Sequence, residues 1–394
     1  MKIGIITLAG GANFGCQLQN FAVKKAYEEL GYEAVTILDS TKKGIRQAEE
    51  KTSRLSKIKP SYISKVISVR LKRKFNMKNQ RDKLIPCAVK SKKEAASLKA
   101  LEAERKLSFK EFFDNKIGHT DYSIDVQNVP YELLKEFDFF SIGSDQVWNP
   151  TYPSTSAIKF LSFTDRNKKL AFAPSFGISE LPDYTKEHYA KWLSDFNMLS
   201  VREARGAQII KELTGKEAEI ICDPTITIER DIWESIEKKP SFDTQKPYAI
   251  TYFLGNETNA YRRFIEKTCK ESDLQIINLF DIWEGEHFTI GPAEFIYLVR
   301  NSKAVFTDSF HAAVFSIIFE RDFMVFDRVE EGRSMSSRLK TLLSTFSLEN
   351  RMYEKGKVFT RADFSHTKDI IRKEKEKAFD FLRRSIETNL RNSD

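Results

Sequence analysis

The sequence of 394 residues has few of the residue types that build disulfides or tight metal sites. Its four cysteines, Cys16, Cys87, Cys222 and Cys269, show no paired spacing. It has only five histidines, and it contains neither a Cys-x-x-Cys nor a His-x-x-x-His pattern. Because disulfide frameworks and zinc sites depend on such paired ligands, we expect neither a disulfide nor a bound metal.

Long apolar runs are missing as well. No stretch of 18 consecutive apolar residues occurs, so the sequence predicts no membrane-spanning helix. The chain opens with an apolar strand rather than with the charged lead and apolar segment of a secretory signal, and we therefore expect a cytoplasmic protein. Its length exceeds one ordinary core, which favours two domains.

The charge is unevenly distributed. The net charge is +8, yet residues 41–110 alone hold 22 Lys and Arg against 6 Asp and Glu, an excess of 16. The rest of the chain is therefore acidic, at −8. In this basic insert (residues 41–110), apolar residues recur at helical spacing between the cations: Tyr62, Ile63, Val66, Ile67 and Leu71. The resulting amphipathic helix either lies on an anionic membrane or packs on the protein with its charges in water.

Apolar strands alternate with helical patterns along the chain. The strands are expected at 2–8, 33–38, 137–142, 169–173, 198–201 and 218–222, and then at 248–254, 275–278, 303–307 and 323–326. The helices are expected at 17–30, 92–115, 186–196, 261–272, 291–300, 311–319 and 364–389. This order predicts an α/β protein with two doubly wound, Rossmann-like domains that face a cleft, followed by a C-terminal crossing helix.

The domain limits follow from where the pattern restarts. We place the N-terminal domain at 1–225, with the basic insert within it, and the C-terminal domain at 226–375. The C-terminal helix, 376–394, is expected to pack back on the N-terminal domain.

The loop after the strand at 137–142 carries the most informative run, Gly143-Ser144-Asp145-Gln146-Val147-Trp148-Asn149. In open α/β sheets, ligands bind beyond the carboxyl ends of strands. An acid, an amide and an indole placed there suit a sugar, which needs both hydrogen bonds and an apolar face. The alternative interpretation is a strand-end turn capped by Asp145, with Trp148 in the core.

Three other strand ends carry candidate groups. His311 falls in the first turn of a helix after the strand at 303–307, where it can hold a proton near neutral pH, or it is a hydrogen-bonded core histidine. Arg202 directly follows a strand and suits a carboxylate or phosphate, or it forms an ion pair with an acid such as Glu203. The glycine-rich loop 9–15 either approaches a phosphate or sugar closely or is a tight turn.

The run at 143–149 resembles the signature of a branch of the polysaccharide pyruvyl transferase family. Five further segments match that family in the same order: 1–22, 173–177, 200–203, 222–225 and 307–312. The resemblance spans roughly residues 1–350. Two positions depart from the family pattern, Cys16 and Pro174.

The resemblance implies a GT-B arrangement and a specific reaction. An enolpyruvyl unit moves from phosphoenolpyruvate to a sugar diol, giving a pyruvate ketal in polysaccharide or exopolysaccharide biosynthesis by a bacterial transferase. His311 is the implied general acid and Asp145 the base, with Asp308 as the other carboxylate considered. No step requires a metal, and phosphoenolpyruvate is a donor substrate rather than a cofactor.

The implied binding residues fall into two groups. The donor-binding residues are Arg202, Ser309, Phe310, His311, Arg328 and Arg338, although arginines such as the last two commonly serve as caps or surface charge. The acceptor-binding residues are Asn13, Gln17, Ser144, Asp145, Gln146 and Trp148. The acceptor is a sugar or a lipid-linked oligosaccharide.

Two other functions are open. One is a GT-B glycosyltransferase that uses a nucleotide sugar. The other is a non-enzymatic protein that binds a membrane surface or a nucleic acid through the basic insert. Aromatic residues are not interleaved with the basic ones as stacking platforms for bases, so we expect no nucleic-acid partner.

We predict that the basic insert brings the protein to the inner face of an anionic membrane. Each basic residue near such a surface contributes about 1 kcal/mol, and the apolar stripe adds shallow burial. The protein is expected to co-sediment with anionic vesicles at low salt and to be released at high salt. Equal sedimentation with neutral and anionic vesicles at low salt would contradict the membrane interpretation.

Overall fold

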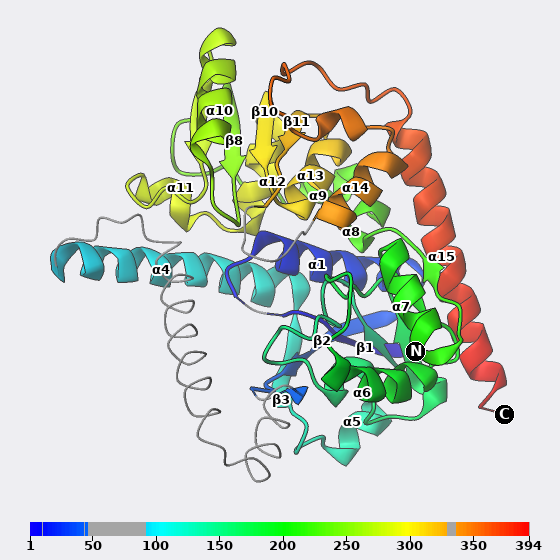
Figure 1. Cartoon of the computed structure of the whole chain (residues 1–394). Helices are drawn as coiled ribbons and strands as arrows, with labels where there is room; N and C mark the ends of the chain where they lie inside the picture. Colours follow the sequence, from blue (N-terminus) through cyan, green and yellow to red (C-terminus); the bar gives the residue numbers. More distant parts are fainter. Residues whose placement is uncertain (10, 43, 46–91, 329–335, 394) are drawn as a thin grey trace, which may run out of the picture.

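The first sheet lies in the N-terminal half of the chain. The computed structural model describes residues 1–9, 11–42, 44–45, 92–328 and 336–393 (Figure 1). Five parallel strands pair in the order β3-β2-β1-β4-β5. Their bounds are β1 Lys2–Ile6, β2 Glu33–Asp39, β3 His119–Ile124, β4 Phe139–Ile142 and β5 Lys169–Ala171. The strand order reverses between β1 and β4, and the crevice beyond their carboxyl ends is where such sheets bind ligands.

The second sheet has four parallel strands in the order β11-β10-β8-β9. They are β8 Tyr248–Tyr252, β9 Gln275–Asn278, β10 Ala304–Thr307 and β11 Asp322–Val325. Here the order reverses between β8 and β10, so this sheet also has a ligand-binding edge. The predicted fold class, α/β with two doubly wound sheets in a GT-B-like arrangement, is confirmed.

Helices connect the strands and cover both sheets (Figure 1). In the first half they are α1 Phe14–Glu29, α4 Lys92–Phe112, α5 Tyr131–Glu136, α6 Asp183–Ser194 and α7 Ala204–Thr214. In the second half they are α8 Pro224–Thr227, α9 Arg230–Ser235, α10 Asn259–Glu271, α11 Gly285–Thr289, α12 Pro292–Asn301, α13 Phe310–Ile318 and α14 Ser336–Thr345. The strands expected at 198–201 and 218–222 are shorter and form a separate parallel pair, β6 Ser200–Val201 and β7 Glu219–Ile220.

Capping side chains set where two of these helices begin. Helix α1 starts at Phe14, earlier than predicted, because the backbone N–H of Cys16 donates to Asn13 Oδ1 at 3.2 Å. Helix α13 starts right after β10, with Ser309 as its N-cap. Both first turns therefore sit at the carboxyl edges of their sheets, where the candidate residues were expected.

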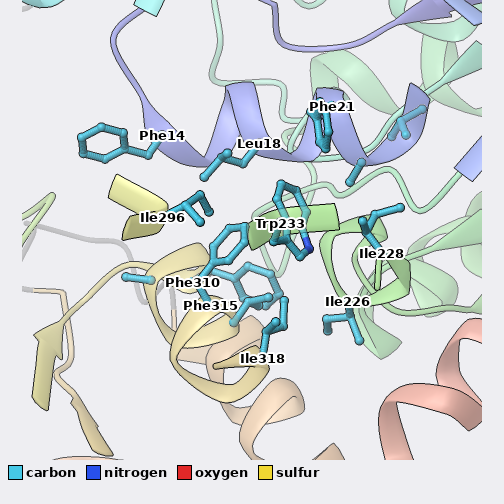
Figure 2. Close-up of a cluster of buried hydrophobic side chains, with 14 of the residues drawn as sticks. Phe14, Leu18, Phe21, Ile226, Ile228, Trp233, Ile296, Phe310, Phe315 and Ile318 are labelled. Carbon is cyan, nitrogen blue, oxygen red and sulfur yellow. The ribbon is translucent and has the colours of Figure 1, made fainter. Parts of the chain in front are cut away.

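Helix α1 joins the two halves through apolar contacts (Figure 2). Phe14, Leu18 and Phe21 on α1 belong to one buried cluster with side chains of the C-terminal half. The Phe14 ring stacks on Phe295 of α12 at 4.5 Å between centroids, and the Phe21 ring lies 5.3 Å from Trp233 of α9. One continuous core therefore spans both sheets and fixes the edge of one against the edge of the other.

Helix α4, at the end of the basic insert, also bridges the halves. Arg105 of α4 is buried among four phenyl rings at 4.9–5.4 Å, those of Phe14, Phe109, Phe280 and Phe288. Its guanidinium donates to the carbonyl of Phe288, and burial lowers the pKa of Arg105 to about 10. The helix expected near 92–115 is thus present, whereas the amphipathic helix around Tyr62 lies outside the described residues.

The last helix, α15 Thr367–Arg391, runs along both halves of the molecule (Figure 1). Near its end, Asn389 Nδ2 donates to the carbonyl of Lys169 on β5 at 2.9 Å, and Arg384 pairs with Glu219 of β7 at 2.9 Å. The domain limit proposed at 376 falls inside this helix. Within the described ranges, no helix combines the length and apolarity needed to cross a bilayer.

Candidate active site

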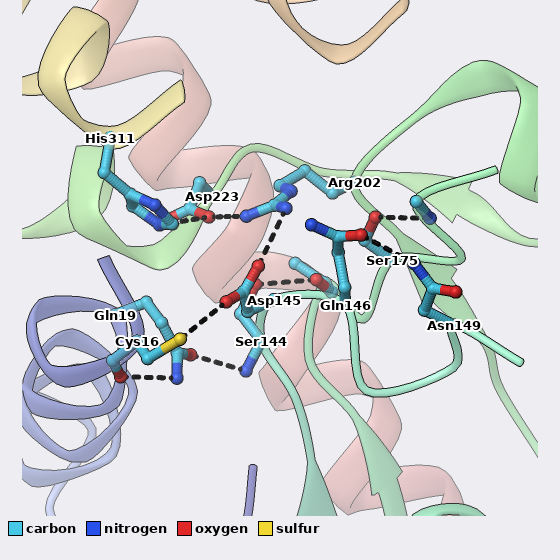
Figure 3. A network of polar contacts seen from close by, with 12 residues as sticks. Cys16, Gln19, Ser144, Asp145, Gln146, Asn149, Ser175, Arg202, Asp223 and His311 are labelled. Carbon is cyan, nitrogen blue, oxygen red and sulfur yellow. Dashed lines mark hydrogen bonds and ion pairs between the residues drawn. The ribbon is translucent and has the colours of Figure 1, made fainter. Parts of the chain in front are cut away.

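Polar side chains from both halves meet where the two sheet edges face each other (Figure 3). Cys16 comes from the first turn of α1, and Asp145 from the loop after β4. Arg202 follows β6, Asp223 follows β7, and His311 lies in the first turn of α13. Each of these groups comes directly after a strand or opens a helix, as the sequence pattern predicts for a ligand site.

Arg202 bridges two buried carboxylates. Its Nη1 donates to Asp223 Oδ2, and its Nη2 donates to Asp145 Oδ1 at 3.3 Å. The side-chain exposure is 3% for Arg202, 8% for Asp145 and 0% for Asp223, so the whole bridge is away from water. Such pairing is what makes buried charges tolerable, because an unpaired one costs several kcal/mol.

The bridge keeps both carboxylates ionised. Burial by itself raises the pKa of Asp145, but the charges of Arg202, His311 and Arg338 outweigh burial and hold it below its usual value. Asp223 behaves in the same way: its burial is outweighed by Arg202 and His311, and its pKa lies well below the ordinary range. For Arg202, the pKa-lowering effect of burial is overcome by Asp223 and Asp145, which raise its pKa.

His311 faces this bridge without a hydrogen bond of its own. Its Nε2 lies 3.6 Å from Asp223 Oδ2 and is buried with no hydrogen-bond partner among the described residues. On its other side the imidazole touches α1, since a Cβ built on Gly15 would lie 2.1 Å from His311 Nδ1. Arg202 Nε is likewise buried and lacks a hydrogen-bond partner within the described part of the chain. Arg202 Nε is therefore left for a ligand, whereas His311 Nε2 is held only by its ion pair with Asp223.

A second arginine approaches across an aromatic ring. The Arg202 guanidinium lies 4.5 Å from the centroid of the Phe310 ring, and the Arg338 guanidinium lies 5.9 Å from it. Burial and the charge of Arg202 lower the pKa of Arg338 to about 10. A cavity of about 110 Å³ is lined by all three residues and by Asp223. Two cations held this close favour an anionic ligand between or beside them.

The loop at 143–149 is fixed by its own hydrogen bonds. The Asp145 carbonyl accepts from Ser175 N and Val147 N, both at 2.8 Å, and Asp145 has a φ of 63°, in the left-handed region. Asn149 Nδ2 donates to Gln146 Oε1 at 2.8 Å. The other terminal atom of the Gln146 amide lies 3.0 and 3.2 Å from the two Arg338 Nη atoms. Gln146 therefore belongs to the site.

Two of the predicted acceptor-binding residues, Trp148 and Ser144, have structural partners in this structure. Trp148 is fully buried, stacks on Phe160 at 5.5 Å and donates from Nε1 to the Lys159 carbonyl at 2.9 Å, so it is a core residue with no face for a sugar. Ser144 is also fully buried, and its hydroxyl donates to the Ala173 carbonyl at 2.7 Å. The run at 143–149 therefore contains two adjacent residues that face the site, Asp145 and Gln146, and others that anchor the loop.

Other candidates have structural partners. Asp308, the alternative base, is occupied: its carboxylate accepts from the N–H groups of Leu254 and Gly255, both at 2.7 Å, and pairs with Arg328 at 3.1 Å. Arg328 is thereby engaged outside the Arg202 bridge. Asn13 and Ser309 are helix caps. Gln17 is buried on α1, and within the described residues no contact joins it to the Arg202 bridge.

The sequence interpretation did not assign three residues of this region. Asp223 was part of a matching segment, and its position directly after a strand was the available signal. Gln19 links the loops: its Nε2 donates to Thr7 Oγ1 at 2.8 Å, and its Oε1 accepts from Ser144 N at 3.0 Å. Tyr152 is close enough that burial, Asp145 and Cys16 together raise the pKa of its phenol. Long-range contacts of this kind leave no local pattern.

Neither the volume of a cavity nor a cluster of metal-ligating side chains identifies the site. Two cavities, of about 580 and 520 Å³, lie along α15 and beside β9, and none of the bridge residues lines them. In the ranges that the structure describes, no group of three or more His, Cys, Asp or Glu side chains is arranged to hold a metal ion. The site is defined by convergent charges instead.

The model of one protein family, polysaccharide pyruvyl transferase, matches residues 13–328. The chain belongs to this family. The match covers both sheet edges and every residue of the Arg202 bridge. The family also accounts for the transferase character and the link to polysaccharide biosynthesis that the resemblance implied. No curated protein matches the chain in sequence.

Solved structures of similar architecture share little sequence with this member of the family. A UDP-GlcNAc 2-epimerase from Neisseria meningitidis, bound to UDP-GlcNAc, aligns over 99% of this chain and 94% of its own at 8% identity, with a TM-score of 0.41. The MnaA–UDP structure from S. aureus covers 98% and 91% at 9% identity and a TM-score of 0.41. The spinosyn rhamnosyltransferase SpnG, with thymidine diphosphate, covers 98% and 96% at 8% identity and a TM-score of 0.35.

We predict that Gly15→Ala lowers turnover by about 10²-fold. The added Cβ would collide with His311 Nδ1, and a displacement of about 1 Å is enough for a loss of that size. The collision is expected to cost about 1–3 kcal/mol of stability, partly offset by the better helix propensity of alanine, and thermal denaturation verifies that the variant is folded. The double variant Gly15→Ala/His311→Ala is the control: it should be no slower than His311→Ala alone. Additive losses in that comparison would show that Gly15 acts independently of His311.

Proposed function

We propose that this protein transfers an enolpyruvyl unit from phosphoenolpyruvate to two hydroxyls of a sugar, forming a pyruvate ketal and releasing phosphate. The observation that carries the proposal is a pair of buried nitrogens, Arg202 Nε and His311 Nε2, that make no hydrogen bond within the described residues and lie beside a second buried arginine, Arg338. A small donor with one carboxylate and one phosphate offers the anionic oxygens that such groups bind.

The donor is proposed to bind at Arg202 and Arg338. Burial and mutual repulsion disfavour two neighbouring guanidinium charges, and an anion relieves both effects. Both Nη atoms of Arg202 donate to carboxylates, those of Asp145 and Asp223, so its Nε faces the ligand. The Phe310 ring packs against the guanidinium groups of both arginines. Ser309 and Arg328 stay predicted donor-binding residues; in the structure Ser309 caps α13 and Arg328 pairs with Asp308.

His311 is proposed to protonate the methylene carbon of the donor. A new C–H bond forms as the N–H bond breaks, and C2 becomes electrophilic. The first sugar hydroxyl attacks C2 and loses its proton to Asp145. The C2–O bond to phosphate then breaks, and the phosphate leaves with the proton held by Asp145. The second hydroxyl attacks C2 and closes the ring, and its proton returns to His311. Asp223 stands between His311 and Arg202 and stabilises the protonated imidazole.

The acceptor is proposed to lie on the N-terminal side, next to Asp145 and Gln146. Tyr152 is a further aromatic candidate on this side, since burial, Asp145 and Cys16 raise the pKa of its phenol. A lipid-linked acceptor and membrane contact through the basic insert stay predictions, because residues 46–91 lie outside the described ranges. The cytoplasmic location is likewise a prediction, as is a reaction without a metal.

We predict that His311→Ala lowers turnover by roughly 10²–10⁴-fold while the protein stays folded, since that is the usual contribution of a general acid. Release of inorganic phosphate in the presence of phosphoenolpyruvate and acceptor measures the effect. His188→Ala is the matched control, because His188 is exposed on α6 and is not part of the proposed site. Near wild-type turnover in a folded His311→Ala protein would rule out the assigned role.

We predict that Arg202→Lys weakens phosphoenolpyruvate binding by at least about tenfold, although the charge is kept. A lysine ammonium cannot span two carboxylates and a ligand as the planar guanidinium does. Calorimetric titration gives the dissociation constant, and Arg205→Lys, an arginine on the partly exposed side of α7, is the control. Equal affinity in both variants would leave Arg202 a structural ion pair, and binding of a nucleotide sugar instead of phosphoenolpyruvate would favour a glycosyltransferase.

A further inference from the structure

Cys16, one of the two departures from the family pattern, touches the proposed base directly. Its Sγ lies 3.4 Å from Asp145 Oδ2, while Arg202 Nη2 lies 3.3 Å from Asp145 Oδ1 (Figure 3). Each oxygen of the carboxylate therefore receives one donor, and the two donors come from different elements, α1 and the segment after β6. Together they fix the plane of the carboxylate.

The thiol can only act as a donor in this contact if it keeps its proton. Burial and the charge of Asp145 raise the pKa of Cys16 well above the ordinary value, and Arg202 opposes them only in part. The phenols of Tyr152 and Tyr252 also lie within electrostatic reach of the thiol. Cys16 is consequently a neutral hydrogen-bond donor near neutral pH.

The contact lies in a place that is built to receive a ligand. His311 Nε2 makes no hydrogen bond within the described residues and lies 3.6 Å from Asp223 Oδ2; its side chain is nine-tenths buried, and its ring touches Gly15, the neighbour of Cys16. The remaining charged groups that face Asp145 are Asp223 and Arg338. No other described cysteine has a comparable partner: Cys222 approaches only the Glu374 carbonyl, at 3.8 Å, and Cys269 lies in an apolar cluster.

We propose that Cys16 is a positioning residue for Asp145, with the thiol fixing the orientation and the basicity of the carboxylate that takes the sugar hydroxyl proton. This inference rests on the proposed function. Alanine at this position leaves Oδ2 without its donor, so the carboxylate rotates more freely and binds a proton more readily. Serine keeps an O–H donor and restores the contact.

The first test is the pH dependence of kcat at saturating phosphoenolpyruvate. In Cys16→Ala, kcat is expected to fall about tenfold, the size of one hydrogen bond to a charged group. The acidic limb of the profile should move upward by roughly half a unit, because the ionised carboxylate has lost a stabilising donor. KM for phosphoenolpyruvate should stay unchanged, and Cys16→Ser should recover most of kcat. An unmoved acidic limb with unchanged kcat in Cys16→Ala would overturn the proposal.

The second test needs no substrate. Iodoacetamide alkylation of the whole protein is followed against pH, and modification at Cys16 is read by peptide mass spectrometry. In Asp145→Asn the midpoint for Cys16 is expected to fall, because the charge that raises the thiol pKa is gone, whereas Cys222 in the same sample should keep its midpoint. Thermal denaturation verifies that each variant is folded.

The two tests separate the two proposals. If Asp145→Asn leaves the Cys16 midpoint unshifted while the wild-type protein turns over phosphoenolpyruvate, the role of Cys16 alone is rejected. If the midpoint shifts in Asp145→Asn but the wild-type protein does not bind phosphoenolpyruvate, the proposed reaction alone is rejected. The alkylation experiment depends only on the thiol and the carboxylate.

Discussion

The bridge that Arg202 makes to Asp145 and Asp223 is the interaction on which the site depends. It joins the loop after β4 to the segment after β7, and it does so in a region with almost no access to water. Loss of the guanidinium would leave two buried carboxylates unpaired, which costs several kcal/mol. The bridge thus fixes the positions of three loops relative to one another. It also supplies the positive charge that an anionic donor requires.

Helix α1 connects this electrostatic centre to the hydrophobic core. Its apolar face carries Phe14, Leu18 and Phe21, which pack against the C-terminal half. Its first turn carries Gly15 against His311 and Cys16 against Asp145. A change in how the two halves pack would therefore move His311 relative to Asp145. The geometry of acid and base is coupled to the interface between the halves through a single helix.

Sequence patterns located the strands, the strand-end loops and the residues His311, Arg202 and Asp145 that meet in the structure. They did so because buried parallel strands have a local signature, and because the carboxyl ends of parallel strands share one edge. Trp148 shows where such reasoning fails. An indole next to polar residues in a loop has the same local pattern whether it faces a ligand or, as here, is buried against Phe160.

The sequence by itself determined the α/β class, the two halves, the family and the residue types at the strand ends, since these depend on periodicity and on motifs that are contiguous in the chain. Only the tertiary structure decided which of those residues share a partner. It separated Asp308, held by backbone N–H groups and Arg328, from Asp145, held by Cys16 and Arg202. It also brought Asp223 into the site. Contacts between residues far apart in sequence arise from packing of the two sheets, and no local pattern encodes them.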